Sequence, residues 1–137
     1  MSRYKEMLKR ASSAGRPLSA HFELTYHCNV RCRHCFQDRN AAPNELNTEE
    51  WLRTVDQARE LGVLTVTLSG GEAMLSEAFW PVAARVRERG MALRIFTNGV
   101  LLTKPNVRRL AALHPSTVEI SIFSLNPAVH DDVTRAP

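Results

Sequence analysis

Residues 64–72 read Leu-Thr-Val-Thr-Leu-Ser-Gly-Gly-Glu, and this stretch contains the pattern on which the fold prediction rests. Apolar and polar side chains alternate as far as Ser69, as expected of a β-strand whose two faces meet different surroundings. The two glycines that follow permit a tight turn, because a residue without a Cβ tolerates backbone conformations closed to others. The stretch therefore predicts a strand that ends abruptly in a turn carrying a carboxylate.

Helix-like segments flank this strand on both sides. Residues 48–61 form the better-signalled one, because Asn47 and Glu50 make a capping box at its start. The second is predicted to begin at a Ser76 cap and to end before Gly90. A helix, a strand and a helix in succession predict a βα unit.

The same alternation extends along the chain in both directions. Further strands are predicted at residues 21–26, 92–97 and 117–123, about one strand every 30 residues. Strands alternating with helices are typical of an α/β fold with a parallel sheet. Residues 1–19 lie outside the repeat and are expected to be a leader or short helix, which leaves residues 20–137 as one domain.

Composition narrows the classes of function. The chain has 137 residues and 44% hydrophobic residues, enough for one packed core. Its net charge of +4 is the difference between 18 basic and 14 acidic residues, which are interspersed, so we expect no nucleic-acid partner. No apolar run approaches the ~20 residues of a membrane span, and a signal-peptide core is absent from the N-terminus. These features predict a cytoplasmic protein without a membrane partner.

The strand pattern carries a prediction of its own. Parallel strands buried on both faces usually read as continuous apolar runs, but here Thr65, Thr67 and Ser69 alternate with apolar residues. Polar side chains directed into a barrel are costly unless they bind something, so a lumen that receives a ligand is one interpretation. The other is a one-sided sheet with its polar face in water.

The strongest chemical signal is Cys28-Asn-Val-Arg-Cys32-Arg-His-Cys35, placed directly after the first predicted strand. The chain has three cysteines, all in this loop, which argues against a disulfide framework and for reduced thiol ligands. Closely spaced thiolates suit zinc or an iron-sulfur cluster. A zinc site needs a fourth ligand, for which only His27 or His34 is near, and each adjoins a cysteine in sequence.

This cysteine array resembles that of the radical S-adenosylmethionine (SAM) superfamily. The resemblance implies that Cys28, Cys32 and Cys35 hold a 4Fe-4S cluster whose remaining iron chelates SAM. It also implies reductive cleavage of SAM to a 5'-deoxyadenosyl radical, with the difficult chemistry supplied by the cofactors. His34 occupies a place near the adenine where the family usually has an aromatic residue.

Later motifs match the same family in order along the chain. The Gly70-Gly71-Glu72 triplet resembles the one that holds the amino group of SAM. Asn98, in Phe96-Thr97-Asn98-Gly99, matches the end of the third family strand, where a simple turn is the alternative. Ser121 matches a position that contacts the ribose, although many members have Asp where Phe123 stands here. All these positions lie at the carboxyl-terminal ends of predicted strands, at the face where β/α barrels build active sites.

The resemblance also implies a fold and partners. The family core is a partial (β/α) barrel of six units, of which this chain would supply about four, as a truncated core domain. Peptide-modifying and cofactor-maturing members are the most similar, so a peptide substrate is expected, with a small electron donor of the flavodoxin or ferredoxin type. Two alternatives remain: a non-catalytic cluster- or SAM-binding fragment that needs a second chain to complete the barrel, and a zinc-binding interaction module.

Overall fold

Four parallel strands form a single sheet in this computed structural model, which describes residues 3–37 and 44–136. The strands follow chain order across the sheet: β1 (Ser19–Glu23), β2 (Thr65–Ser69), β3 (Ala92–Thr97) and β4 (Thr117–Ile120). Parallel neighbours need a crossover between them, and the helices supply it. The α/β architecture predicted from the sequence is confirmed.

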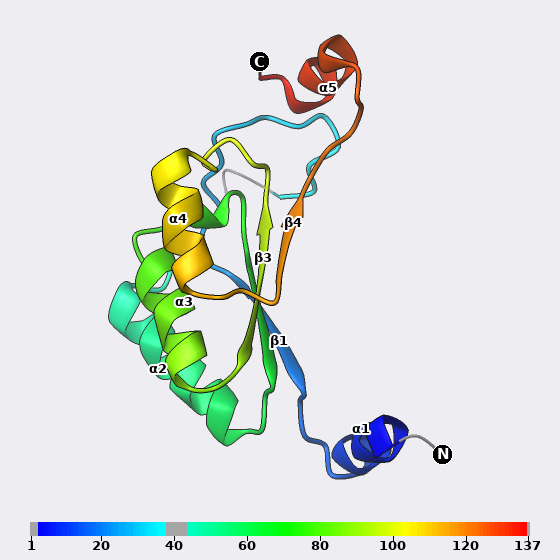
Figure 1. Ribbon diagram of the computed structural model, residues 1–137, viewed down its shortest axis with the longest axis vertical. Coiled ribbons are helices and arrows are strands. Elements are labelled where there is room, and N and C mark those ends of the chain that lie inside the picture. The colour runs from blue at the N-terminus through cyan, green and yellow to red at the C-terminus, as the bar shows by residue number, and fades with distance from the viewer. Residues whose placement is uncertain (1–2, 38–43, 137) are drawn as a thin grey trace.

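Five α-helices and one 3-10 helix accompany the sheet within the described ranges: α1 (Arg3–Ser13), α2 (Thr48–Glu60), η1 (Ala73–Leu75), α3 (Phe79–Glu88), α4 (Lys104–Ala112) and α5 (Pro127–Thr134). Figure 1 shows α2, α3 and α4 on the same side of the sheet, α1 near the start of β1, and α5 beyond the carboxyl end of β4. None of these helices combines the length and apolarity that crossing a lipid bilayer requires.

The core lies between the sheet and the three helices that cover it. Val66 pairs with Leu93 and Leu68 pairs with Ile95, and all four side chains are fully buried. The helices bury apolar side chains against them, namely Val55, Phe79, Val82, Ala83 and Val86. Burial of about 25 cal/mol for each Å² of apolar surface makes this layer the main source of stability.

The opposite face of the sheet is polar. His21, Thr67 and Arg94 lie side by side on β1, β2 and β3, and Arg94 forms an ion pair with Glu119 of β4. No helix in the described part of the chain covers this face (Figure 1). The alternation predicted from the sequence therefore separates a helix-covered face from a face that borders a cavity at its carboxyl end.

Two strand boundaries differ from the sequence prediction. β1 begins and ends two to three residues earlier than residues 21–26, because the hydroxyl of Thr25 and the amide of Tyr26 donate to Glu45 instead of extending the strand. β4 ends at Ile120 rather than residue 123. Beyond the bond from the Ser121 amide to the Thr97 carbonyl, β3 offers no further partner, since it ends at Thr97.

The start of α3 also differs. Ser76 was expected to cap this helix, but the chain first makes η1, which is capped by the side chain of Glu72. Ser76 then accepts from the Ala78 amide at 3.3 Å, and α3 begins at Phe79. Pro81 at the third helical position is compatible with this start, since the first turn has no intrahelical N–H partner to lose.

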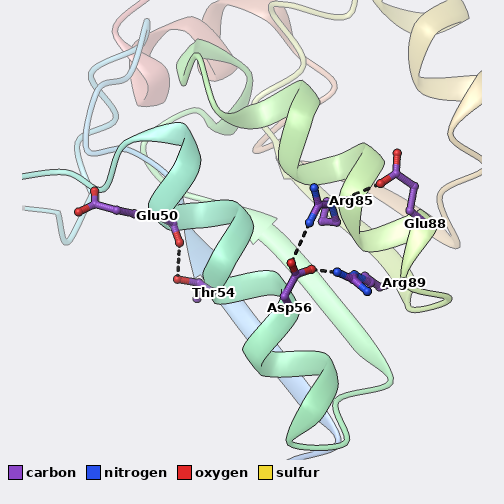
Figure 2. A network of polar contacts seen from close by, with 6 residues as sticks. All are labelled: Glu50, Thr54, Asp56, Arg85, Glu88 and Arg89. Atoms are coloured by element: carbon purple, nitrogen blue, oxygen red, sulfur yellow. Dashed lines mark hydrogen bonds and ion pairs between the residues drawn. The ribbon is translucent and has the colours of Figure 1, made fainter.

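A polar network joins α2 to α3 on the outside of the molecule. Figure 2 shows Asp56 of α2 between Arg85 of α3, at 2.8 Å, and Arg89, the residue that follows α3, at 2.7 Å. The hydrogen bond from Arg89 is the main cause that holds the pKa of the Asp56 carboxyl below its ordinary value. The pair of bonds fixes how the two helices lie against each other.

Candidate functional site

The three cysteines lie in the loop that leaves the carboxyl end of β1. No disulfide joins them, and the Cys35 amide donates to the Cys32 carbonyl at 3.2 Å in a turn. All three border one cavity of about 390 Å³, a size typical of small-molecule sites. Val30, inside the loop, is buried and anchors it to the molecule.

The predicted site residues converge on this cavity from four strands. Besides the cysteines, five of them line it: His34, Gly70, Gly71, Asn98 and Ser121. Glu72 is the exception, because it is not among the lining residues. Ser69, one of the alternating polar residues predicted to face a lumen, also lines the cavity, together with His21 and Glu23, which were not named as site residues.

The Gly70-Gly71 turn packs directly against the backbone that enters the cysteine loop. Gly71 donates to the Thr25 carbonyl at 2.7 Å, and Glu72 donates to the His27 carbonyl at 2.8 Å. A Cβ at Gly71 would lie 2.4 Å from the His27 carbonyl oxygen, and one at Gly70 would lie 2.4 Å from that of Thr25. These glycines are therefore required for close contact between two backbone segments, just before Cys28.

Glu72 is a buried carboxylate, with 1% of its surface exposed. One oxygen accepts from the Asn98 amide at 2.8 Å, and the Thr97 hydroxyl lies 3.0 Å from each oxygen. The other oxygen also accepts from the Met74 amide at 3.3 Å. In this structure the side chain thus joins the turn after β2 to the end of β3.

Asn98 continues this chain of contacts toward the cysteines. Its side-chain nitrogen donates to the Cys28 sulfur at 3.7 Å and to the Asn29 side-chain oxygen at 2.7 Å. The Thr-Asn-Gly segment is therefore more than a simple turn, since its amide group reaches the predicted cluster ligand.

The helix α5 supports the cysteine loop from the other side. The amides of Arg31 and Arg33 donate to the carbonyls of Thr134 and Val133, each at 2.9 Å, and the Arg33 side chain forms an ion pair with Asp132. The sequence analysis missed this contact. Asn126 caps this helix and Pro127 is its first residue, which are local signals that say nothing of its packing partner.

The rings of His34, Phe123 and His130 contact one another in sequence, and His34 directly precedes the third cysteine. The His34 ring lies 4.6 Å from Phe123, edge to face, and Phe123 stacks on His130 at 5.8 Å. Phe123 lines the cavity together with Ser121. His34 is thus held at the cavity wall by an aromatic partner that follows β4.

No ion-sized metal site is assembled in residues 3–37 and 44–136: no three His, Cys, Asp or Glu side chains lie close enough to bind one metal ion together. The Cys3His arrangement that a zinc module needs is therefore not formed by these residues, His27 and His34 included. The three thiols border a cavity larger than one ion instead.

Comparison with known proteins agrees with this geometry. The family model described as "Radical SAM superfamily" matches residues 22–137. PqqA peptide cyclase of Granulibacter bethesdensis is 39% identical over 107 residues, covering 77% of this chain and 29% of that protein. The mycofactocin maturase MftC of Mycolicibacterium smegmatis is 31% identical over 132 residues, covering 96% of this chain and 33% of that protein.

Solved structures show the same fold. SuiB of Streptococcus suis bound to precursor peptide SuiA superposes with a TM-score of 0.78 at 21% identity, covering 96% of this chain and 31% of that one. SuiB bound to S-adenosylmethionine gives a TM-score of 0.76 at 22% identity. The chain spans about a third of the length of the curated relatives it matches. With its four parallel strands and a family match over residues 22–137, the chain belongs to the radical SAM superfamily.

Proposed function

We propose that the chain binds a 4Fe-4S cluster through Cys28, Cys32 and Cys35 and binds SAM beside it, as the core of a radical SAM enzyme. The observation that carries the proposal is that three thiols and the Gly70-Gly71 turn border one cavity at the carboxyl ends of the strands. Thiolates are the ligands that iron-sulfur clusters use. Three of them leave one iron of a four-iron cluster open to another ligand.

The residues around the cavity suit SAM in distinct ways. Gly70 and Gly71 line the cavity without side chains, and a backbone carbonyl of this turn is the group that would accept from the amino group of SAM. Ser121 offers a hydroxyl to the ribose, and the His34 ring offers a flat surface to the adenine. When bound and reduced, the cluster supplies the electron that cleaves SAM and begins radical chemistry on a substrate.

A peptide or a cofactor precursor is the substrate class that the relatives support. PqqA peptide cyclase and a mycofactocin maturase match in sequence, and SuiB was solved with its precursor peptide. The electron would come from a small donor of the flavodoxin or ferredoxin type, acting in the cytoplasm.

The test is anaerobic reconstitution with iron and sulfide, followed by dithionite and SAM. We expect about four irons for each chain and formation of 5'-deoxyadenosine, whereas Cys35→Ser, which removes one thiolate, should lose both. A folded protein that binds one zinc and no iron would refute the proposal.

A second candidate is a non-catalytic cluster- or SAM-binding fragment that acts with another polypeptide. In it, residues 1–19 would be a leader and residues 20–137 a core with four of six units. The observation that favours it is exposed apolar surface along and after β4, where Ile122 and Leu125 are 62% and 96% exposed. A cluster-loaded protein that makes 5'-deoxyadenosine only after a co-purified chain is added would support this candidate over the first.

A further inference from the structure

The amide of Asn98 points at the sulfur of a predicted cluster ligand, and its orientation is fixed by independent contacts. The Asn98 side-chain oxygen accepts from the Val100 amide at 3.0 Å. That bond assigns oxygen and nitrogen within the side chain, because of the two ends of an amide group only the oxygen accepts from an N–H group. The nitrogen is therefore the atom that faces Cys28, at 3.7 Å.

The backbone of Asn98 is held as firmly as its side chain. Its amide donates to the buried Glu72 carboxylate at 2.8 Å, and the Thr97 hydroxyl, which also contacts Glu72, accepts from the Gly99 amide at 3.0 Å. The two hydrogens of the Asn98 amide then have separate acceptors, the Cys28 sulfur and the Asn29 oxygen, the latter at 2.7 Å. The Asn98 amide is therefore already oriented toward Cys28 in the protein without a bound ligand.

Binding of iron by Cys28 would strengthen this contact. As a thiol, Cys28 lies 4.0 Å from the Asn29 oxygen and can donate to it. As an iron-bound thiolate it has no proton to donate and becomes an acceptor, and hydrogen bonds to a charged acceptor are stronger than neutral ones. Hydrogen bonds to cluster sulfurs are one of the factors that set the reduction potential.

We propose that Asn98 is a positioning residue that donates an N–H···S hydrogen bond to Cys28 and thereby raises the one-electron reduction potential of the cluster, with Glu72 holding Asn98 in place. The donor favours the reduced cluster because that form carries one more negative charge. This role rests on the proposed function, and it assigns to the end of β3 a task separate from contact with SAM.

The test is a redox titration of the reconstituted cluster in the absence of SAM, with dithionite as the electron source and the reduced cluster followed by EPR. Asn98→Ala should lower the equilibrium constant for reduction about tenfold, which for one electron is about 59 mV. Asn98→Asp should lower it further, since the carboxylate keeps the acceptor for Val100 but replaces the N–H donor with a negative charge.

Asn106→Ala is the matched control. Its side chain donates to the Leu101 carbonyl at 2.8 Å in the same β3–α4 connection, and it makes no contact with a cysteine among the hydrogen bonds of the described residues. We expect this variant to keep the wild-type potential. Variants of Asn98 that keep the wild-type potential while SAM binding weakens would overturn the proposal, because Asn98 would then act on SAM alone.

A measurement on unaltered Asn98 covers the case in which its variants do not fold. With asparagine labelled with 15N at the side-chain nitrogen, pulsed EPR of the reduced cluster should detect one coupled nitrogen that persists in Asn29→Ala. If Asn29→Ala, which still contains Asn98, shows no coupled nitrogen, the proposal is overturned. A wild-type protein that takes up no iron refutes the proposed function. If the wild-type protein cleaves SAM and both Asn98 variants keep its reduction potential, only the role of Asn98 is refuted.

Discussion

Gly71 lies where two backbone segments are too close for any side chain. A Cβ there would lie 2.4 Å from the His27 carbonyl oxygen, one residue before the first cysteine. We expect Gly71→Ala to lower the free energy of unfolding by about 3 kcal/mol, since overpacking forces the backbone to move. The displaced cysteine loop should also take up less iron during reconstitution.

The control for Gly71 is Gly90→Ala. Gly90 has a φ of +72° and open space around it, so an alanine there suffers only the strain of a left-handed conformation, about 1 kcal/mol. Denaturant unfolding and iron content measured on both variants separate the two effects. Normal iron uptake by Gly71→Ala would contradict the close contact seen in the structure.

Glu72 gives a second prediction at the scale of the residue. Glu72→Ala leaves the Thr97 hydroxyl and the Asn98 amide without their buried acceptor, which should cost about 2–3 kcal/mol of unfolding free energy. Glu72→Gln keeps an oxygen for the Asn98 amide and should cost less, about 1 kcal/mol. If Glu72→Ala instead keeps the wild-type unfolding free energy but loses SAM binding, the carboxylate binds SAM rather than stabilising the fold.

The motif placed both Gly71 and Glu72 at the site, and the structure finds Gly71 in the cavity lining but not Glu72. Two glycines after a strand indicated a close backbone approach, and the structure shows that the approach is to residues 25–27. The direction of the Glu72 side chain depends on the turn geometry and on donors from β3, 25 residues further along the chain. The spacing of the motifs along the chain predicts neither the geometry of this turn nor the position of these donors.

The contact between α2 and α3 yields a prediction for two elements. Asp56 accepts from both Arg85 and Arg89 (Figure 2), and Asp56→Asn should lower the unfolding free energy by about 0.5–1 kcal/mol at pH 7. Because the pKa of this carboxyl is lowered in the folded state, its contribution is full above the ordinary value of 3.8 and is lost as the pH falls through the lowered value.

Urea unfolding at a series of pH values checks this sign. The difference between wild type and Asp56→Asn should be constant near neutral pH and should shrink below pH 3.8. Glu49→Gln is the control, because its ion pair with Arg53 lies on the exposed surface of α2 alone, with side chains 82% and 63% exposed, and we expect almost no effect. If the difference in unfolding free energy between wild type and Asp56→Asn instead increases below pH 3.8, the lowered pKa of Asp56 is contradicted.

At the level of elements, local signals predicted the helices with the clearest caps. The Asn47 and Glu50 box is present, with bonds of 3.0 and 2.8 Å, and α2 begins where it predicts. The ends of β1 and β4 were predicted less well, because a strand ends where its neighbour stops offering partners. The end of a strand thus depends on both strands of a pair, and the β-branched residues of one strand do not predict it.

The packing of α5 on the cysteine loop belongs to the whole molecule. It includes two backbone hydrogen bonds, one hydrogen bond from the Arg33 side chain to the Asp132 carbonyl at 3.0 Å, and one ion pair. Arg33→Ala keeps the backbone donor and loses the two side-chain contacts. Because the side chains of the ion pair are 55% and 59% exposed, we expect a stability change within about 0.5 kcal/mol and normal iron uptake. Arg33→Pro removes the N–H group that reaches Val133 and should reduce iron uptake markedly.

Iron content and EPR signal of the two Arg33 variants test this support. Equal losses in both would show that the charge, not the backbone pairing, holds the loop. A contact of this kind has no local signature in the sequence, because neither partner segment is periodic and many residues separate them. A lumen was one of two interpretations of the polar strand faces, and the cavity lies where the motifs after the strands were expected to gather, at one edge of the sheet.

The pairing of the cysteine loop with α5 also sets an order of events during synthesis. Arg33 and Asp132 are 99 positions apart in the sequence, so the ribosome completes the thiol-bearing loop long before the segment that braces it. A nascent chain therefore exposes the three thiols without this support until the 99 positions up to Asp132 have been added. If the thiols bind a cluster as proposed, we expect its insertion to be productive only after Thr134 has emerged from the exit tunnel.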